Sequence, residues 1–273
     1  MKVIEVLIST YNDNIIRAIN VPLLPKEGVC YLICHQVTGE YILSPKVQDC
    51  IAKLISIRSD IRYIKFNNFG LSKNRNNCLD NISSDAKYVY ICDDDIRLQD
   101  DFDKIILKSF SNEWDVLTFK ILSDNDLPFK KYPVNKCKHS LKTLLAVSSV
   151  EVVIKSSLIS RTNIKFDERF GLGALYSASE ENIFLIDLYR QGARIGFIPK
   201  FICYHPFESS GKNWSNKLMA FSKGAFFKRV FGTYLGLIIV IVFSFKKYNE
   251  YKEFHSLTSF TTENIKSFFS FKC

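Results

Sequence analysis

The sequence lacks the features that would place it in several common classes. It has eight cysteines but no CxxC pair, and the cysteines are scattered, several of them inside apolar runs. We therefore expect reduced, mostly buried thiols in a cytosolic protein, with a structural zinc site as the minor alternative. The first residues, MKVIEVLIST, do not follow the secretory pattern, because Glu5 breaks the apolar run and Tyr11-Asn12-Asp13 follows it. This segment is predicted to be the first strand.

The main part of the chain also lacks a strong excess of positive charge. The net charge is +9, but residues 211–273 contain ten Lys or Arg and only three Glu, so most of the excess lies in this tail. This distribution argues against a nucleic-acid-binding face on the main domain. With 273 residues, 47% of them apolar, the chain can form one substantial core. We predict a main domain at 1–210 and a basic, apolar helical tail at 211–273.

The tail lacks a full-length membrane span, which usually needs about 20 apolar residues. Its uncharged run, residues 230–245 (VFGTYLGLIIVIVFSF), has 16 residues and lies between Lys228-Arg229 and Lys246-Lys247. Cations on both flanks and aromatic residues at the ends favour a helix that lies in, or dips into, an anionic membrane leaflet. A buried packing helix or a homodimer contact is the alternative.

One stretch combines a buried-strand pattern with a cluster of acids. Residues 88–98 read YVYICDDDIRL, in which five apolar or aromatic residues run directly into Asp93, Asp94 and Asp95. An uninterrupted run of this kind is typical of a strand buried on both faces, as in a parallel sheet. Ligands of open α/β sheets bind beyond the carboxyl ends of the strands, so these carboxylates are candidates for binding a cation and a phosphorylated ligand. A solvated acidic turn is the alternative.

Strand and helix patterns alternate along the chain and predict an α/β fold with a mostly parallel central sheet flanked by helices. The polar segment 122–140 contains two prolines and is predicted to be an irregular loop that shapes the acceptor site. The other predicted strands cover residues 3–8, 31–37, 61–66, 115–121, 147–154, 194–199 and 201–204, and the predicted helices include about 45–56 and 102–110.

Two segments carry groups suited to a nucleotide. Tyr11, at the end of the first strand, can stack on a nucleobase, and a packing role is the alternative. Ser72 is a plausible N-cap of a helix whose first turn contains Lys73 and Arg75. A helix N-terminus with two cations is an anion site by dipole and by charge, or else these cations are simply solvated.

A second pair of acids opens a predicted buried helix that starts near Ser177 or Ser179 and ends at Gly192. Glu180 fits a capping box with the preceding serines. Glu181 lies in the first turn, where the helix dipole favours its ionised form, and is a candidate general base. His205, at the end of a predicted strand, is either structural or a ligand of a metal bound by the aspartates.

The motifs follow one another in an order that resembles a known family. They are STYND after the first strand, GLSKNRNNCL, YICDDDIRL, FDERFGLG, SEENIFL and YHP. Together, over about residues 3–207, they resemble the inverting nucleotide-sugar glycosyltransferases of family 2, which have the GT-A fold. The resemblance extends to bacterial surface-polysaccharide transferases.

The resemblance implies a nucleotide site near the first strand. Thr10, Tyr11 and Asn12 would line the nucleotide pocket, and Arg75, with Lys73, would sit near the base or the diphosphate. A UDP-sugar is the favoured donor. The acidic, serine-rich motif that the family usually has after its second strand is replaced here by CHQVTG at 34–39, so the identity of the nucleotide stays open.

The resemblance also implies roles for the acidic triplet. Asp93 would address the ribose, with Asp94 beside it in the cofactor site. Asp95, together with Asp93 and His205, would bind Mn²⁺ or Mg²⁺ at the diphosphate.

The implied reaction is direct displacement at the anomeric carbon by an acceptor hydroxyl, with inversion. The position of the base falls on Glu181. The family usually has Asp there, so Glu180 remains the alternative base. The acceptor would be a glycan or a lipid-linked molecule, and the enzyme would be cytoplasmic and attached to the inner face of the membrane through its tail. A catalytically inactive relative that binds nucleotides or glycans at the membrane is the alternative function.

Overall fold

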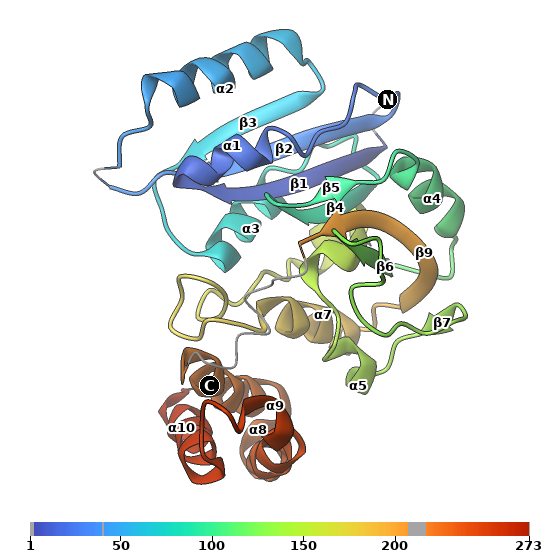
Figure 1. Cartoon of the computed structure of the whole chain (residues 1–273). Coiled ribbons are helices and arrows are strands. Elements are labelled where there is room, and N and C mark those ends of the chain that lie inside the picture. The colour runs from blue at the N-terminus through green and yellow to red at the C-terminus, as the bar shows by residue number, and fades with distance from the viewer. Residues whose placement is uncertain (1–2, 40, 207–216, 273) are drawn as a thin grey trace. The chain divides into compact units, whose positions relative to one another are not determined.

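The computed structural model describes residues 3–39, 41–206 and 217–272 (Figure 1). The chain folds into two compact units. The first unit comprises Met1–Phe69, Lys73–Lys165 and Asp187–Phe207, and the second comprises Gly70–Ser72, Phe166–Ile186 and Glu208–Cys273. The C-terminal tail therefore shares a unit with the segment that contains Glu180 and Glu181.

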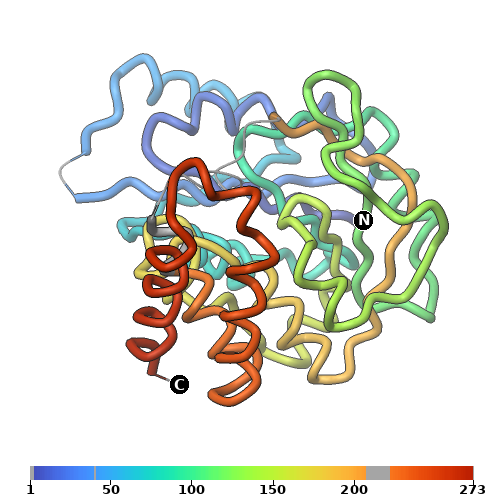
Figure 2. The backbone as a smooth tube through the Cα atoms, turned by 60° about the horizontal axis from the view of Figure 1, so that its bottom comes forward, coloured from blue at the N-terminus to red at the C-terminus, as the bar shows by residue number. Residues whose placement is uncertain are grey.

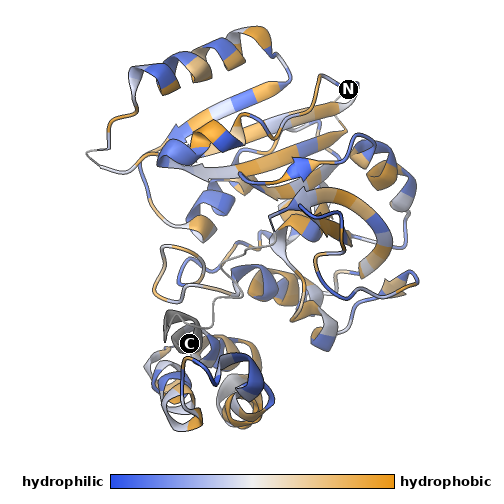
Figure 3. Cartoon of the chain, in the orientation of Figure 1, coloured by the Kyte–Doolittle hydropathy of each residue, from blue (hydrophilic) through white to orange (hydrophobic). Residues whose placement is uncertain are grey.

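Four parallel strands form the first half of the sheet in the first unit. They are β1 (Ile4–Tyr11), β2 (Val29–Gln36), β3 (Ile61–Phe66) and β4 (Tyr88–Asp93), and they lie in the order β3-β2-β1-β4. Nearly every residue of β1 and β2 is buried, as expected for parallel strands covered on both faces. These strands are mostly apolar (Figure 3), and the predicted strand 61–66 is confirmed with its bounds.

The sheet becomes mixed beyond β4. Strand β8 (Val152–Lys155) runs antiparallel to β4 and to β6 (Val116–Ser123), and β6 pairs in parallel with β9 (Ile195–His205). Strand β9 is one curved strand (Figure 1), whereas the sequence predicted two pieces. Its pairing with β6 changes register on either side of Lys120, a slip that lets Pro199, which has no N–H to donate, stay within the strand. Two short strands, β5 (Arg97–Leu98) and β7 (Cys137–Lys138), pair antiparallel with β9.

Helices flank this sheet. Helix α2 (Pro45–Ile57) packs beside β3, and α4 (Phe102–Ser109) packs beside β9. The start of α2 follows from its sequence, because the Ser44 side chain accepts a hydrogen bond from Val47 N and proline occupies the first turn. The predicted helices at 45–56 and 102–110 are confirmed. The remaining elements are η1 (Asn12–Asn14), α1 (Ile15–Ala18), α3 (Leu71–Asp80), α5 (Leu141–Leu144), η2 (Ser149–Glu151), α6 (Ser156–Thr162) and α7 (Glu180–Arg190), of which the last residues, from Asp187, belong to this unit.

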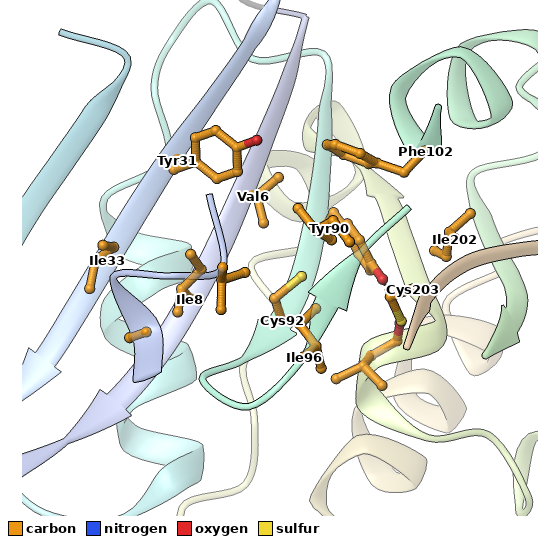
Figure 4. Packing of buried hydrophobic residues seen from close by; sticks show 14 of the residues in the cluster. Val6, Ile8, Tyr31, Ile33, Tyr90, Cys92, Ile96, Phe102, Ile202 and Cys203 are labelled. Atoms are coloured by element: carbon orange, nitrogen blue, oxygen red, sulfur yellow. Dashed lines mark hydrogen bonds between the residues drawn. The ribbon is translucent and has the colours of Figure 1, made fainter. Parts of the chain in front are cut away.

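The core of the first unit lies between the sheet and its helices. Val6 and Ile8 of β1 pack with residues from β2, β4, α4 and β9 (Figure 4). Tyr90 is fully buried, and its hydroxyl donates a 2.9 Å hydrogen bond to the carbonyl of Val150. The cysteines described are free thiols, and five of the seven are buried, which agrees with the reduced state expected.

Three local predictions differ from the structure. Ser72 is not the N-cap of α3, because the helix begins one residue earlier, at Leu71, and the Ser72 hydroxyl donates to the carbonyl of Phe170 instead. The predicted strand at 147–154 begins only at Val152, because Ser148 and Glu151 form a capping box that closes the 3₁₀ turn η2. The predicted irregular loop at 122–140 contains the end of β6 and the short strand β7.

The second unit contains a helix that reverses direction. Helix α8 (Lys217–Lys246) has a non-helical residue, Gly232, with φ of 73°. The ring centroids of Phe227 and Phe243 are only 5.1 Å apart, whereas 16 residues of a straight helix would separate them by about 24 Å. The two halves of α8 therefore fold back on each other at Gly232. Although Ser222–Lys246 could cross a membrane by length and composition alone, it is not one straight helix.

Two further helices, α9 (Tyr248–Tyr251) and α10 (Leu257–Ser270), complete this bundle, in which α8 and α10 run side by side (Figure 2). The rings of Tyr251 and Phe260 stack at 3.7 Å. A Cβ added to Gly224 would lie 1.8 Å from the carbonyl oxygen of Asn264. Glycine is therefore required there, because it lets α8 approach the backbone of α10.

Candidate active site

The carboxyl ends of β1 and β4 lie next to each other in the sheet. Ser9 of β1 is in register with Asp93 of β4. The residues that follow emerge at one edge, where Thr10 Oγ1 donates a 2.8 Å hydrogen bond to Asp94 Oδ2. The acidic triplet thus begins at the last residue of a buried strand, which is the position that the apolar run predicts.

Asp93 holds a buried arginine at this edge. Its Oδ1 accepts a 2.7 Å hydrogen bond from Arg75 Nη2, and its Oδ2 accepts one of 3.2 Å from Ser149 Oγ. Burial alone would raise the pKa of Asp93, but Arg75, with smaller effects from His205 and Ser149, lowers it below its usual value. Asp93 is therefore an anion, and it fixes an arginine that is only 3% exposed.

Asp94 is also satisfied by its neighbours. Besides the bond from Thr10, its Oδ1 pairs with Arg17 Nη2 at 2.8 Å. Burial is the largest effect on the pKa of Asp94 and, although Thr10 and Arg17 oppose it, the pKa rises to about 6. Asp94 therefore joins the loop after β4 to the first helix of the chain.

Asp95 is the member of the triplet whose side chain is left open. Its Oδ1 is buried and has no hydrogen-bond partner among the described residues, and His205 Nε2 lies 3.8 Å from it. Burial, with the charge of Asp93, raises the pKa of Asp95. His205 Nδ1 is 2.7 Å from the carbonyl of Pro206, which can only accept, so Nδ1 carries the hydrogen. In the neutral ring, Nε2 then has a free lone pair.

These residues fit a divalent cation only in part. Within residues 3–39, 41–206 and 217–272, no group of three or more His, Cys, Asp or Glu side chains is arranged to hold a metal ion. The expected trio is incomplete because Asp93 turns to Arg75 and Ser149. The pair of Asp95 and His205 fits a cation that takes its other ligands from water and from phosphate oxygens, as Mg²⁺ commonly does.

An aromatic pair is formed by the last residue of β1 and a residue that follows β3. The rings of Tyr11 and Phe69 meet edge to face at 5.3 Å, and the Tyr11 hydroxyl is 3.3 Å from Thr38 Oγ1. Tyr11 is 36% exposed and Phe69 is 53% exposed. Partly exposed rings of this kind can stack on a nucleobase.

The CHQVTG segment holds the loop after β1. His35 Nε2 lies 2.9 Å from the carbonyl oxygen of Asn12, and Asn12 Oδ1 accepts a hydrogen bond of 3.4 Å from Thr38 N. Asn12 has a φ of 45°, a left-handed conformation that these contacts stabilise. Burial lowers the pKa of His35. This histidine is therefore a neutral support for the loop.

Helix α3 ties the ends of β1 and β2 together. Asn74 Nδ2 donates to the carbonyl oxygens of Thr10 and Cys34, at 3.0 Å and 2.9 Å. On the same helix Lys73 is exposed, whereas Arg75 is buried against Asp93. The two predicted cations therefore differ, since only Arg75 is held in place by a described ion pair.

Glu180 and Glu181 open α7, in the second unit. Glu180 is 6% exposed and Glu181 is partly buried. A Cβ added to Gly171, which has φ of 101°, would lie 3.2 Å from Glu180 Cδ and 2.8 Å from Ser72 Oγ. Glycine thus lets this loop pass close to the glutamate. The helix is buried and ends before Gly192, with φ of 83°, as predicted.

Four residues at these sites were not among the predicted ones. They are Arg17, Phe69, Asn74 and Ser149. The partners of Arg17, Asn74 and Ser149 lie 77, 64 and 56 positions away in the chain, so no local spacing indicates them. Asn74 lies inside the GLSKNRNNCL motif, which was the one available signal. The catalytic, nucleotide and metal roles of the predicted residues stay predictions.

Comparison with known proteins agrees with this arrangement. Residues 44–161 match the model of the glycosyl transferase family 2. Comparison with curated protein sequences finds no match.

Solved structures share the fold at low sequence identity. A fragment of S. aureus TarS, residues 1–349, in complex with UDP-GlcNAc is 13% identical, with a TM-score of 0.62 over 99% of this chain and 92% of that one. The same fragment with UDP is 16% identical, with a TM-score of 0.61 over 98% and 81%. The mannosyltransferase PcManGT from Pyrobaculum calidifontis, in complex with GDP-Man and Mn²⁺, is 10% identical, with a TM-score of 0.56 over 97% and 86%.

The family match covers β3, α3, β4 and the acidic triplet, which form part of the sheet edge described above, whereas β1, β2 and β9 lie outside the matched range. The curled sheet flanked by helices is the GT-A fold of the solved structures. The predicted fold and enzyme class are therefore confirmed. This chain is a glycosyltransferase of GT-A fold whose residues 44–161 match the model of the glycosyl transferase family 2.

Proposed function

We propose that this enzyme transfers a sugar, with inversion, from a nucleoside diphosphate sugar to a hydroxyl of a glycan or lipid-linked acceptor in the synthesis of a surface polysaccharide. One observation carries the proposal. Asp95 Oδ1, which has no hydrogen-bond partner among the described residues, lies near His205 Nε2 at the sheet edge where Asp93 pairs with Arg75. A UDP-sugar is the favoured donor, which is supported by the TarS structures with UDP and UDP-GlcNAc.

The proposed mechanism is one displacement. The acceptor oxygen forms a bond to the anomeric carbon while the bond from that carbon to the diphosphate oxygen breaks. Glu181 takes the proton of the acceptor hydroxyl, and the nucleoside diphosphate leaves. Asp95 and His205 would hold Mn²⁺ or Mg²⁺, which supplies positive charge to the departing diphosphate. The neighbour solved with GDP-Man and Mn²⁺ supports this choice of metal.

The aromatic pair would bind the base of the donor. Tyr11 and Phe69 offer partly exposed rings, and Thr10 and Asn12 form the loop beside them. Because His35 holds the Asn12 carbonyl and Thr38 N holds its side chain, this loop would be ordered before the donor binds. Preorganisation of this kind reduces the entropic cost of binding.

The tail would attach the enzyme to the cytoplasmic face of a membrane. The second half of α8 exposes apolar side chains at helical spacing on one face, beside the exposed Lys246 and Lys252. Monomeric soluble proteins rarely expose an apolar stripe of this kind, and cations beside it suit anionic lipids. A homodimer contact is the alternative occupant. The exposed side chains are Tyr234, Leu235, Ile238, Ile241, Val242 and Phe245.

Donor turnover tests the catalytic assignment. Purified protein with Mn²⁺ and a panel of nucleotide sugars should release nucleoside diphosphate slowly. The Glu181→Gln variant should reduce this release by about 10²- to 10⁴-fold, because the general base is removed, and should leave donor affinity unchanged. Glu180→Gln is the companion variant, and a larger loss there would move the base to Glu180. Glu113→Gln, at an exposed ion pair, controls for the loss of charge.

Two outcomes would contradict the proposal. Full activity of Glu181→Gln and of Glu180→Gln would exclude both carboxylates as the base. Donor binding without any turnover would instead favour the inactive, ligand-binding relative.

A further inference from the structure

The residue before the two glutamates has an unusual backbone conformation. Ser179 has φ of 77°, in the left-handed region that serine rarely adopts. A residue held there costs about 1–3 kcal/mol, and the conformation persists only where the surroundings enforce it. Ser179 is 3% exposed and is followed directly by Glu180 and Glu181 at the start of α7. The contacts that hold Ser179 therefore also set the direction of the first turn of α7.

Those contacts come from the tail helix. Lys223 Nζ, on α8, donates a 2.8 Å hydrogen bond to Ser179 Oγ. The hydroxyl of the neighbouring Ser222, which is fully buried, is 3.2 Å from Ser177 Oγ. Two consecutive residues of α8 thus contact the two serines that precede α7.

The position of Lys223 on α8 is fixed from the other side. The next residue, Gly224, packs against the backbone of α10 at Asn264, where a Cβ does not fit. Ala225 N donates a 3.1 Å hydrogen bond to Ser267 Oγ of α10. Residues 222–225 of α8, which include Lys223, therefore contact the start of α7 on one side and α10 on the other.

The charges around Lys223 are those of the candidate base and its neighbour. Burial lowers the pKa of Lys223, while the carboxylates of Glu181 and Glu180 on α7 act in the opposite direction and Lys247 adds to the lowering. Helix α10 contributes Asn264 and Ser267 at this point, which do not titrate. Lys223 is thus a cation of α8 whose charge acts on Glu181 and Glu180.

We propose that Lys223 is a positioning residue for catalysis, which holds Ser179 in its left-handed conformation and keeps Glu181 in the carboxylate form that accepts a proton. This inference rests on the proposed function, in which Glu181 is the base. Because Lys223 belongs to α8, the tail completes the catalytic segment as well as presenting its apolar stripe. No local motif in the sequence indicates this role, because Lys223 and Ser179 are 44 positions apart in the chain.

The pH profile of donor turnover tests this role. The rate should rise with pH as the base loses its proton. An adjacent cation lowers the pKa of a carboxyl group by about one unit or more, so its removal should raise that pKa. In Lys223→Met the acidic limb of the pH profile, where the rate rises as the base loses its proton, should therefore move to higher pH by about one unit. At pH values below the pKa of the base, turnover should be about tenfold lower than in the wild type. Lys223→Arg, which keeps the charge, should restore the wild-type limb.

Two more variants separate charge from structure. Lys223→Gln keeps a hydrogen-bond donor for Ser179 without the charge, so its limb should move as in Lys223→Met while its melting temperature stays closer to that of the wild type. Lys228→Met removes another lysine of α8, one that donates to the carbonyl of Phe271 at 2.7 Å. This control should leave the limb in place.

The outcomes distinguish this inference from the proposed function. If Glu181→Gln abolishes turnover but Lys223→Met and Lys223→Gln lower the rate equally at every pH, the inference is overturned and the proposed function stands. If Glu181→Gln and Glu180→Gln both stay active, the base assignment fails first, and the role of Lys223 fails with it.

Discussion

The two units place their apolar and charged side chains differently. In the first unit, strands β1 and β2 bury nearly all of their residues, and the edge after β4 is polar, with Asp93 and Asp94 each held by an arginine. In the second unit, α8 and α10 bury aromatic rings such as Phe227 and Phe260, yet the outer face of the second half of α8 is apolar as well.

Because of this difference, the two units suit two different kinds of ligand. A polar edge with one open carboxylate, Asp95, suits a small, highly charged molecule such as a nucleoside diphosphate sugar. An exposed apolar face beside cations suits an extended surface. Under the proposed function the same chain would have two sites of different chemistry, and substitutions in each unit test whether these sites are independent.

The largest expected effect concerns the open carboxylate. In Asp95→Asn, Mn²⁺-dependent donor turnover should fall by about 10³-fold, or about 4 kcal/mol of activation free energy. Chelation of the metal should lower the wild-type rate to a similar level and have little further effect on the variant. Steady-state release of nucleoside diphosphate measures both.

The neighbouring aspartate provides the contrast. In Asp94→Asn the amide oxygen still accepts the bond from Thr10 Oγ1, and the lost partner Arg17 is 53% exposed, so turnover should fall less than tenfold. Asp101→Asn, an exposed position without a side-chain capping bond, should be neutral. Equal losses in Asp94→Asn and Asp95→Asn would contradict the view that only Asp95 is open to a ligand.

The next effect concerns packing in the second unit. Gly224→Ala places a methyl group where only 1.8 Å separates it from the Asn264 carbonyl oxygen. Overpacking of this kind costs about 1–3 kcal/mol or more, which outweighs the gain of about 1 kcal/mol in helix propensity. We expect a lower melting temperature and faster hydrogen exchange in α8 and α10. Thr262→Ala, at an exposed position within α10, tests propensity alone and should not destabilise. A stable Gly224→Ala would show that α8 and α10 are not closely packed.

Patterns in the sequence predicted the elements whose residues decide their own structure. The strand 61–66, the helix from Pro45 and the helix end at Gly192 depend on local spacing, proline and glycine. The position of the three aspartates at the end of β4 was predicted correctly, because a strand buried on both faces must end where charged residues begin.

Features that depend on distant contacts were not predicted. Residues 230–245 form an uncharged run with two glycines, Gly232 and Gly236, and nothing within it indicates at which of them, if either, the chain reverses. The reversal at Gly232 is stabilised by the contact of Phe227 with Phe243. In the same way, Lys223 was counted only as one charge of a basic tail. Its contact with Ser179 depends on how α8 packs within its unit.

The smallest expected effect tests whether the outer face of α8 binds lipid. In the double variant Leu235→Glu and Ile238→Glu, the free energy of binding to anionic liposomes, measured by flotation, should weaken by about 1 kcal/mol in total, because buried apolar area is lost and negative charge is added. The matched control is Ile55→Glu and Ile57→Glu on α2 of the first unit, which are also exposed but end a helix with polar neighbours. That control should float like the wild type, and both double variants should keep donor turnover. If the α8 variant instead floats normally but sediments as a monomer where the wild type is a dimer, a second copy of the chain covers the apolar face. The apolar face of the second unit would then serve dimer formation and not membrane binding.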